Sequence, residues 1–408
     1  MKERELPRPG LIGSLREIFG KRVTEQNQPT ITLLSLWGIS TSGTRVTVDE
    51  VLKIPAVLAC VRAISETAGM LPYKLMRTFK GTYEVAEWLD EYRLLFDAPN
   101  EYQTADQFRQ ALTVDYLLSG NGIAEKEKSL SGTIYALHRI HPYRLTNVFM
   151  DTAGHIRYVV DGKELSRDVI FHLPGPSLNG DGIGGDSLVA RARDALGLAI
   201  GQQEYAAAYY ANGATPATIL IHPKTLKDDA AKRIEASFKN NFRGVKNSHK
   251  FALLEEDMKL QQVGNNAADS QLIEARREQV IEICRVFRMP PHMVYSLERA
   301  TFSNIEEQAS EFLEYTMMPH FVRWEKNCAQ QLLPKQDRPY YYWKHVVDAL
   351  MRGKTLERYQ AYQLAIQNGI YSPNEARAKE DVNPYAGGDE HYRQMNTEGV
   401  NIKKEPEK

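Results

Sequence analysis

Three short stretches of the sequence contain residue types that could bind or transform a ligand. The run Gly180–Gly185 has the G-x-G-x-x-G spacing with which dinucleotide-binding proteins hold a phosphate at the start of a helix. His138 and His141 could supply two nitrogen ligands to a metal ion such as zinc. Between Lys224 and Lys250, eight basic residues stand against three acidic ones. Each stretch also has a structural explanation that involves no ligand.

The surroundings of Gly180–Gly185 argue against a dinucleotide site. The run follows a strand-like segment and opens a helix, as the motif requires. That helix is too long for a crossover unit, however, and no second strand with an acidic residue about 20 positions on follows it. We therefore expect a plain turn or hinge at residues 180–185. A nucleotide-dependent enzyme is the rival hypothesis, and it rests on this run alone.

The histidine pair is expected to be structural. His138 and His141 fall in a predicted strand or turn, where a spacing of three does not hold both side chains on one face. The chain also contains no G-x-x-x-x-G-K-[ST] phosphate loop and no G-x-S-x-G nucleophile turn. The sequence thus predicts no catalytic residue, no metal site and no cofactor.

The basic stretch stands out because the chain as a whole is nearly neutral. Its local net charge is +5, whereas the formal net charge of the chain is −1. Near-neutrality argues against DNA binding by the whole surface, so any DNA contact must be local or weak. The stretch is either the solvated face of a helix or a docking or DNA-proximal surface, and a monomeric DNA-binding module is a third possibility. Its basic residues are Lys224, Lys227, Lys232, Arg233, Lys239, Arg243, Lys246 and Lys250.

Length and composition indicate a folded protein of several parts. A chain of 408 residues exceeds one hydrophobic core, so two to four packing units are expected. No window approaches the roughly 20 uninterrupted apolar residues of a membrane span, so no membrane contact is expected. Met1–Pro7 has no apolar stretch after its basic residues, which predicts folding in the cytoplasm without a cleaved signal. Cys60, Cys284 and Cys328 are odd in number and far apart, so we expect buried free thiols.

The first half of the chain predicts a mixed α+β unit. Residues 1–46 lack periodicity and read as a flexible arm. Thr47 and Glu50 have capping-box spacing, and Pro55 should split the following helix into a short turn and a main helix that ends near Gly69. Residues 71–76 resemble an edge strand, residues 104–119 a helix, and residues 122–173 a series of short strands separated by Ser131-Gly132, Asp151–Gly154 and Asp161-Gly162.

The second half predicts two long helices around a small insert. Residues 186–212 should form one long helix of roughly 40 Å, at about 1.5 Å per residue. A second begins near Ser270 and ends before Met289. The insert should contain a strand at 217–222, a helix at 226–242 and a hairpin of 250–254 with 258–263. The rest is predicted as a helix at 304–333 kinked at Pro319, an aromatic strand at 338–345, helices at 348–368 and 373–381, and a disordered tail from Ala386.

A string of motifs in a fixed order resembles the portal family of long-tailed bacteriophages, over roughly residues 50–389. A fairly specific part is Asp97–Asn100, Thr104, Phe108 and Leu117–Gly122. One departure is Gly185-Asp186-Ser187, where many relatives have Gly-Ser-Pro; aspartate or serine can still cap the next helix. The remaining motifs are Val57–Val61 with Leu71-Pro72, Ile170–His172, Asp181–Gly185, Phe287–Pro291, Ser303–Gln308 with Pro319, Gly369, Ser372, Asn374–Arg377 and Gly387–Asp389.

The resemblance implies a multi-subdomain portal fold and a cyclic homo-oligomer of about twelve subunits at one capsid vertex. The chain would then be a virion structural protein, made in the host cytoplasm and not an enzyme. The implied layout is a flexible arm (1–46), a wing (47–185 with 304–345), two stem helices (186–212 and 268–290), a small α/β clip (213–267), a tunnel loop region (291–303), a helical crown (346–385) and a disordered tail (386–408).

The resemblance also implies partners and a passive mechanism. Double-stranded DNA would pass non-specifically through the ring during packaging and ejection, driven by a separate terminase large subunit that docks on the clip and is later replaced by a head–tail adaptor. The ring would contact the major capsid protein. A channel should hold DNA loosely, because each neutralised phosphate strengthens the grip. The tunnel loop is placed at Leu297, Glu298, Arg299, Ala300, Thr301, Phe302 and Ser303, where an ordinary helix connection is the alternative.

Overall fold

The computed structural model divides into two compact units, Met1–Lys344 (unit 1) and His345–Lys408 (unit 2). Within the described part of the chain, no helix combines the length and apolar character that a bilayer crossing requires. The structure describes residues 31–32, 38–79, 82–178, 180, 182–211, 218–221, 259–262, 267–294, 310–347, 355–380 and 382–392.

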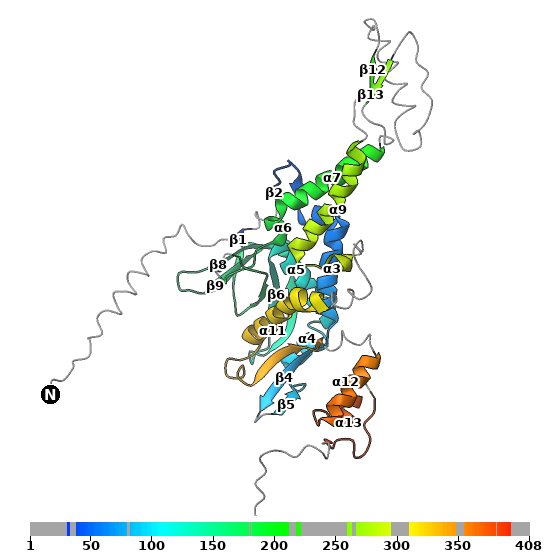
Figure 1. The fold of residues 1–408 in the computed structure, drawn as a ribbon. Coiled ribbons are helices and arrows are strands. Elements are labelled where there is room, and N and C mark those ends of the chain that lie inside the picture. The colour runs from blue at the N-terminus through cyan, green and yellow to red at the C-terminus, as the bar shows by residue number, and fades with distance from the viewer. Residues whose placement is uncertain are drawn as a thin grey trace, which may run out of the picture. The chain divides into compact units, whose positions relative to one another are not determined.

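Two packed helices form the centre of unit 1, and both begin where the sequence predicts. Thr47 accepts a hydrogen bond from the amide of Glu50 (3.2 Å) and starts α2 (Val48–Leu52), and Pro55 then opens α3 (Pro55–Met70). A capping box of Thr104 and Gln107 starts α5 (Ala105–Ser119), which packs against α3 (Figure 1). The short α4 (Asp90–Phe96) lies between them in the sequence.

Unit 1 also contains antiparallel sheets. One sheet has the order β11-β6-β7 and another the order β1-β8-β9-β10. The turns between their strands fall at the predicted Gly132, Gly154 and Gly162, all with positive φ. The strands are β1 (Ile31–Thr32), β6 (Asn121–Lys128), β7 (Ile134–Ile140), β8 (Leu145–Met150), β9 (Ile156–Val160), β10 (Lys163–Ser166) and β11 (Ile170–Pro174).

A third sheet corrects the prediction of an edge strand at residues 71–76. The strand β4 (Tyr73–Phe79) is the central one, with β5 (Thr82–Val85) on one side and β14 (Tyr341–His345) on the other. β14 is contributed by a segment more than 260 residues away, so nothing near β4 in the sequence announces it. The Tyr73 ring stacks on that of Trp343 at 4.9 Å, and both side chains are buried.

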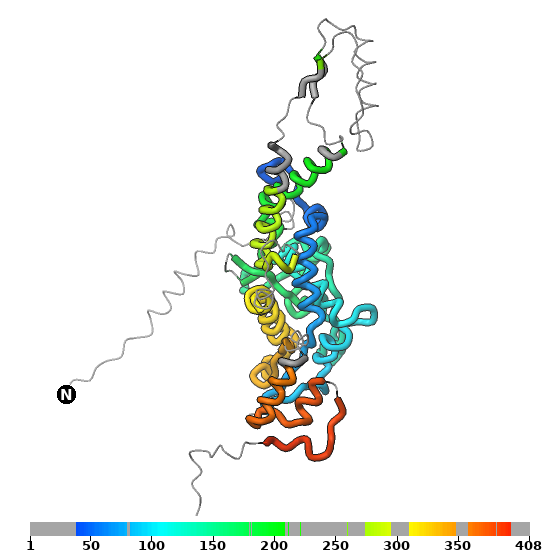
Figure 2. Tube along the Cα trace, turned by 45° about the vertical axis from the view of Figure 1, so that its right-hand side comes forward, coloured from blue at the N-terminus to red at the C-terminus, as the bar shows by residue number. Residues whose placement is uncertain are grey.

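The predicted long helix at 186–212 is wrong in one respect: it is broken. Residues Leu188–Arg191 form α6, Ala192 leaves helical geometry, and α7 runs from Arg193 to Ala211. The second long helix, α9 (Ala267–Phe287), starts slightly earlier than predicted. In Figures 1 and 2, α7 and α9 lie side by side and α9 also lies beside α3.

The insert between these helices is described only at its two ends. The predicted strand near 217–222 is confirmed as β12 (Thr218–Ile221). It pairs antiparallel with β13 (Lys259–Gln262), whose predicted partner, residues 250–254, lies outside the described residues. The predicted helix at 226–242 also lies outside them.

The helix predicted at 304–333 contains a wide turn just before Pro319. Residues Phe312–Met317 form a π-helix, η5, which runs directly into α11 (Met318–Leu332). Pro319 stands in the first turn of α11 and has no amide hydrogen to donate to the preceding turn. The amide of Met318 donates instead to the carbonyl of Leu313, five residues back.

Unit 2 consists of α12 (Thr355–Gln367), α13 (Pro373–Ala378) and the segment that returns along α13. Gly369, at φ +65°, ends α12, and the amide of Ile370 donates to the carbonyl of Ala365 (2.8 Å). A capping box of Ser372 and Glu375 then starts α13. Short helices thus begin and end here on local signals alone.

Candidate functional site

The helix pair α7 and α9 is held firmly where it joins the rest of unit 1. Gln279 of α9 donates its side-chain amide to the carbonyl of Ala195 in α7 (2.9 Å). At Gly197 of α7, a Cβ atom would lie 2.3 Å from the hydroxyl of Ser40, so the loop before α2 lies directly against the helix. The amide of Thr41 in the same loop donates to the carboxylate of Asp194 (2.8 Å). The bases of the two helices are therefore fixed.

Two of the three cysteines lie in the contact between α9 and α3. Cys60 and Cys284 are fully buried and free, and Cys328 is buried on α11, as the sequence predicts. The neighbouring thiol and burial raise the pKa of Cys60, so the Cys60 thiol is a neutral, apolar part of the helix contact.

The basic docking residues predicted from the sequence lie in the insert that this helix pair carries. All eight, from Lys224 to Lys250, fall between β12 and β13 and lie outside the described residues. The strand register pairs Ile221 with Lys259. The insert therefore leaves and re-enters the described structure at neighbouring points.

The predicted tunnel loop is also bounded by a fixed frame, although residues 297–303 lie outside the described residues. α9 ends where the amide of Met289 donates to the carbonyl of Cys284 (2.8 Å), and the short helix η4 (Pro291–Val294) follows. On the far side of the loop, the hydroxyl of Thr316 in η5 donates to the carbonyl of Arg288 (2.5 Å). This bond joins the segments before and after the loop.

The glycine run forms a tight backbone crossing and no phosphate cradle. A Cβ at Gly185 would lie 2.2 Å from the carbonyl of Gly120 and 2.3 Å from the amide of Gly175. The amide of Gly185 donates to the side chain of Asn121 (3.0 Å), and that of Asp186 to the carbonyl of Pro176 (2.7 Å). These amides, at the approach to α6, are directed into the protein, which supports the turn hypothesis over the nucleotide hypothesis.

Asn121 connects this crossing to a buried hydrogen-bond network. Its carbonyl oxygen lies 2.9 Å from Nε2 of His172, whose Nδ1 lies 3.1 Å from the hydroxyl of Tyr158. Gln331 of α11 accepts from the amide of His172 (2.8 Å) and donates to its carbonyl (2.6 Å). Burial lowers the pKa of His172 to about 3, so the ring is neutral, with Nε2 the donor. Three sequence motifs, around 121, 172 and 185, thus meet at one place.

Sequence reasoning missed this network, although a signal was present. Asn121 and His172 are polar residues at positions where the surrounding strand residues are apolar and buried. A buried polar group must find a partner, because leaving it unpaired costs about 1–3 kcal/mol. The partner on α11 could not be read from either strand.

A second buried polar contact holds α5 to β7. Asp115 is only 3% exposed, and Arg139 binds its carboxylate through two nitrogens, each at 2.6 Å. Burial raises the pKa of Asp115, and Arg139 opposes that shift. An exposed counterpart exists on the same unit: Arg144 donates two hydrogen bonds to Asp161, at 2.8 and 2.6 Å.

The histidine pair does not assemble a metal site. His138 lies 2.9 Å from the carboxylate of Glu127, and its other nitrogen lies 3.4 Å from the hydroxyl of Tyr102. His141 instead accepts a hydrogen bond from the amide of Tyr143 (3.3 Å) and starts a short turn. Across the described parts of the chain, no three histidine, cysteine or acidic side chains are grouped to hold an ion.

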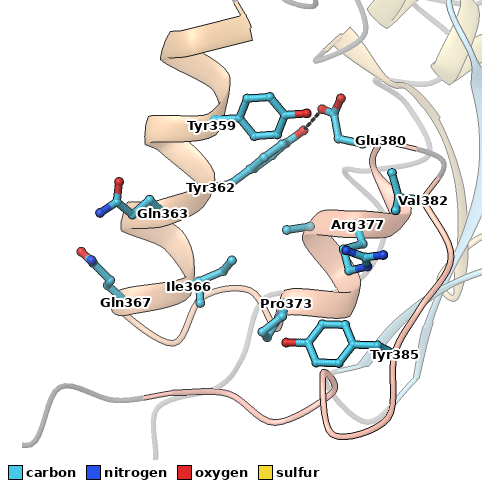
Figure 3. Close-up of a pocket in the computed structure, with 11 residues that line it drawn as sticks. Tyr359, Tyr362, Gln363, Ile366, Gln367, Pro373, Arg377, Glu380, Val382 and Tyr385 are labelled. Atoms are coloured by element: carbon cyan, nitrogen blue, oxygen red, sulfur yellow. Dashed lines mark hydrogen bonds between the residues drawn. The ribbon is translucent and has the colours of Figure 1, made fainter.

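Unit 2 contains an open pocket between its two helices (Figure 3). The cavity is about 620 Å³. Its acidic group is paired: Glu380 binds Arg358 (2.5 Å) and accepts from the hydroxyl of Tyr362 (3.0 Å). The lining residues are Tyr359, Tyr362, Gln363, Ile366, Gln367, Pro373, Ala376, Arg377, Glu380, Val382 and Tyr385.

Comparison with known proteins gives one consistent result. The sequence matches the family described as "Phage portal protein" over residues 55–381. The chain is 31% identical to the probable portal protein of Streptomyces phage phiC31 over 392 residues, which cover 91% of this chain and 84% of that one. It is 30% identical to the portal protein of Enterobacteria phage HK97 over 356 residues, which cover 85% and 82%.

Solved structures share the fold at lower identity. A crystal structure of an HK97-family phage portal protein from Corynebacterium diphtheriae aligns with a TM-score of 0.57 at 18% identity, covering 75% of this chain and 98% of that one. The neck of a native gene transfer agent particle, computed with C12 symmetry, aligns with a TM-score of 0.54 at 22% identity, covering 81% and 91%. The predicted mixed α+β fold class is confirmed.

Proposed function

The chain belongs to the phage portal protein family, as the order of its motifs predicts, and we propose that it is the subunit of a closed ring of about twelve copies. Family membership makes it a structural component of the virion. In our proposal the ring occupies one capsid vertex, contacts the major capsid protein, and is the channel for double-stranded DNA during packaging and ejection. The observation that carries the proposal is the family match over residues 55–381.

The geometry of unit 1 suits this role. α7 and α9 lie side by side with fixed bases, so repetition around an axis would give a rigid helical tube. We assign the wing to 47–185 with 304–345, the stem to 186–212 and 268–290, the clip to 213–267, the tunnel loop region to 291–303 and the crown to 346–385. A ring of identical subunits needs two different contact surfaces on each copy.

We assign no catalytic step to this chain. The glycine run that favoured an enzyme directs the amides of Gly185 and Asp186 into the protein. The energy for DNA movement must then come from a separate ATPase, the terminase large subunit, docked on the clip until a head–tail adaptor replaces it. The basic residues from Lys224 to Lys250 are the proposed docking surface.

The tunnel loop, Leu297–Ser303, is proposed to touch DNA as it passes. Arg299 can meet phosphates, while Glu298 beside it keeps the local charge near zero and the grip weak. Alanine at both positions should leave the ring intact and change DNA packaging or retention. Variants that assemble, package and retain DNA like the parent would remove this loop from the mechanism.

The ring itself is tested on the purified chain. Mass photometry and negative-stain electron microscopy should show particles near twelve times the 46.4 kDa subunit mass, with a central hole. A mass of one subunit at every protein and salt concentration would overturn the proposal.

A further inference from the structure

Unit 2 exposes two different apolar surfaces, one on each side of α12. The first is the pocket between α12 and α13, where Tyr359, Val382 and Tyr385 are 53%, 44% and 48% exposed. Tyrosine and arginine are the side chains enriched at the energetic centres of protein interfaces. The pocket thus has the composition of a protein-binding surface.

The second surface lies on the opposite side of the same helix. Leu364 is two residues from both Tyr362 and Ile366, which is about 200° of helical rotation, so it points away from the pocket. It is 60% exposed, and Ile370, placed by the turn at Gly369, is 65% exposed. Both side chains are therefore accessible to a partner surface.

Charge indicates what covers these surfaces. From Tyr359 to Asn374 the chain contains no charged residue, although 25% of its residues are charged. In the pocket, Arg377 donates to the carbonyl of Asn383 (2.8 Å), and its guanidinium lies 5.5 Å from the centre of the Tyr385 ring. Of the charged residues that line the pocket, Glu380 is bound to Arg358 and Arg377 keeps its positive charge, whereas the stretch of α12 that carries Leu364, from Tyr359 on, has no charge. The uncharged stretch therefore suits a protein surface and not a DNA backbone.

We propose that the occupant is a second copy of this chain: Leu364 and Ile370 of one subunit insert into the tyrosine-lined pocket of the next. The inference rests on the proposed ring. In a head-to-tail ring, one surface of each subunit contacts a different surface of the next subunit at every interface. Each unit 2 then gives its apolar side chains to one neighbour and receives those of the other.

Disulfide crosslinking tests the contact. A variant with Leu364→Cys and Val382→Cys is oxidised after its ring mass has been checked. Within one subunit the two positions lie on opposite sides of α12, so only neighbouring subunits can be joined. Denaturing, non-reducing electrophoresis should give a ladder of multiples of 46.4 kDa that collapses on reduction. The native cysteines are all buried and give a low background.

The single variants are the matched controls, and they distinguish a head-to-tail contact from a two-fold contact. Leu364→Cys alone and Val382→Cys alone should give no ladder; dimers from either would mean a two-fold contact and overturn the inference. A second pair, Ile370→Cys with Tyr385→Cys, guards against one poorly placed cysteine. If neither pair gives a ladder in intact rings, the proposed contact between unit 2 copies is wrong and the proposed ring is unaffected. If the parent chain has the mass of one subunit, the proposed ring is wrong.

Photo-crosslinking from a benzophenone amino acid at position 382 then identifies the occupant. In rings mixed with isotope-labelled subunits that lack the benzophenone, the labelled crosslinked peptide should come from residues 359–371. A peptide from any other part of the chain, such as the apolar stretch Leu11–Phe19, would overturn the inference.

Discussion

The centre of unit 1 and the helix pair of unit 2 are both tied by specific hydrogen bonds, yet they differ in what they leave exposed. Around Asn121 the backbone crosses so closely that only glycine fits, and buried polar groups bond to each other. In unit 2, Asn374 ties α13 to the returning chain at Tyr385, while Leu364 and Ile370 stay exposed. The first region is complete within one chain. The second region leaves apolar surface exposed that another chain can cover.

This difference predicts two kinds of mutational effect. Changes at the unit 1 centre should lower the free energy of unfolding of the subunit, whereas changes on α12 should lower assembly with little effect on subunit stability. The predictions below run from the largest expected change in unfolding free energy to the smallest.

Gly120→Ala should have the largest effect. Gly120 has φ +86°, and an added Cβ would lie 2.3 Å from the carbonyl oxygen of Gly185. Alanine would be strained in this left-handed conformation, and its Cβ would clash with the backbone around residue 185, which cannot move aside. Together these effects should lower the free energy of unfolding by about 3–5 kcal/mol. Gly132→Ala is the control, because Gly132 also has φ +86° but no atom within 4 Å. It should cost only about 1–2 kcal/mol. Equal losses in denaturant unfolding would show that the crossing is not tight.

Arg139→Ala should cost about 2–3 kcal/mol, because it leaves Asp115 buried without its partner. The loss should shrink as pH falls, since protonation removes the unpaired charge. Arg144→Ala breaks the exposed pair with Asp161 and should cost less than about 1 kcal/mol. Thermal and denaturant unfolding of both variants measures the difference. Similar losses would mean that the burial of Asp115 has no energetic consequence.

Acid should destabilise the centre of unit 1 through its neutral histidines. Burial lowers the pKa of His172 and of His320 to about 3, from an ordinary value of 6.5. Between those values the unfolded chain binds protons that the folded chain excludes, so stability falls as pH drops from about 6.5 towards 3. The slope is about 1.4 kcal/mol per pH unit for each histidine.

The variant His172→Gln should reduce that slope by one histidine's share in denaturant unfolding measured from pH 7 to pH 4. An unchanged slope in His172→Gln would contradict the buried neutral ring.

Leu364→Asp should change subunit stability least, by less than about 0.5 kcal/mol, because the side chain is 60% exposed. Its effect on assembly should be large, since a carboxylate in an apolar pocket loses its hydration. Ring mass across a dilution series, beside subunit unfolding, measures both. Loss of stability without loss of assembly would reverse the comparison between the two regions.

Local signals in the sequence were enough for several helix starts. Thr47, Thr104 and Ser372 each cap a helix at the residue where the capping-box spacing is found. The strand series of residues 122–173 was also predictable, because glycine-containing turns separate it into short runs. These features depend on residues within one or two turns of each other.

Features that depend on distant segments were not predictable. β4 is central only because β14 returns to it from the far end of unit 1, and the break at Ala192 has no proline or glycine at that residue to announce it. Asn121 and His172 could be suspected as buried polar residues, but Gln331 is supplied by α11, about 160 residues later. The docking and tunnel residues stay predictions, since they fall outside the described residues.

The pairing of Ile221 with Lys259 has a consequence for how portal chains can diversify. A segment that leaves and returns at adjacent points can be exchanged as a cassette, because the two flanking helices need not move to accept a replacement. Loop closure adds only about 0.6 kcal/mol for each doubling of length. A phage lineage could therefore enlarge, shorten or replace this segment while α7 and α9 keep their packing against each other.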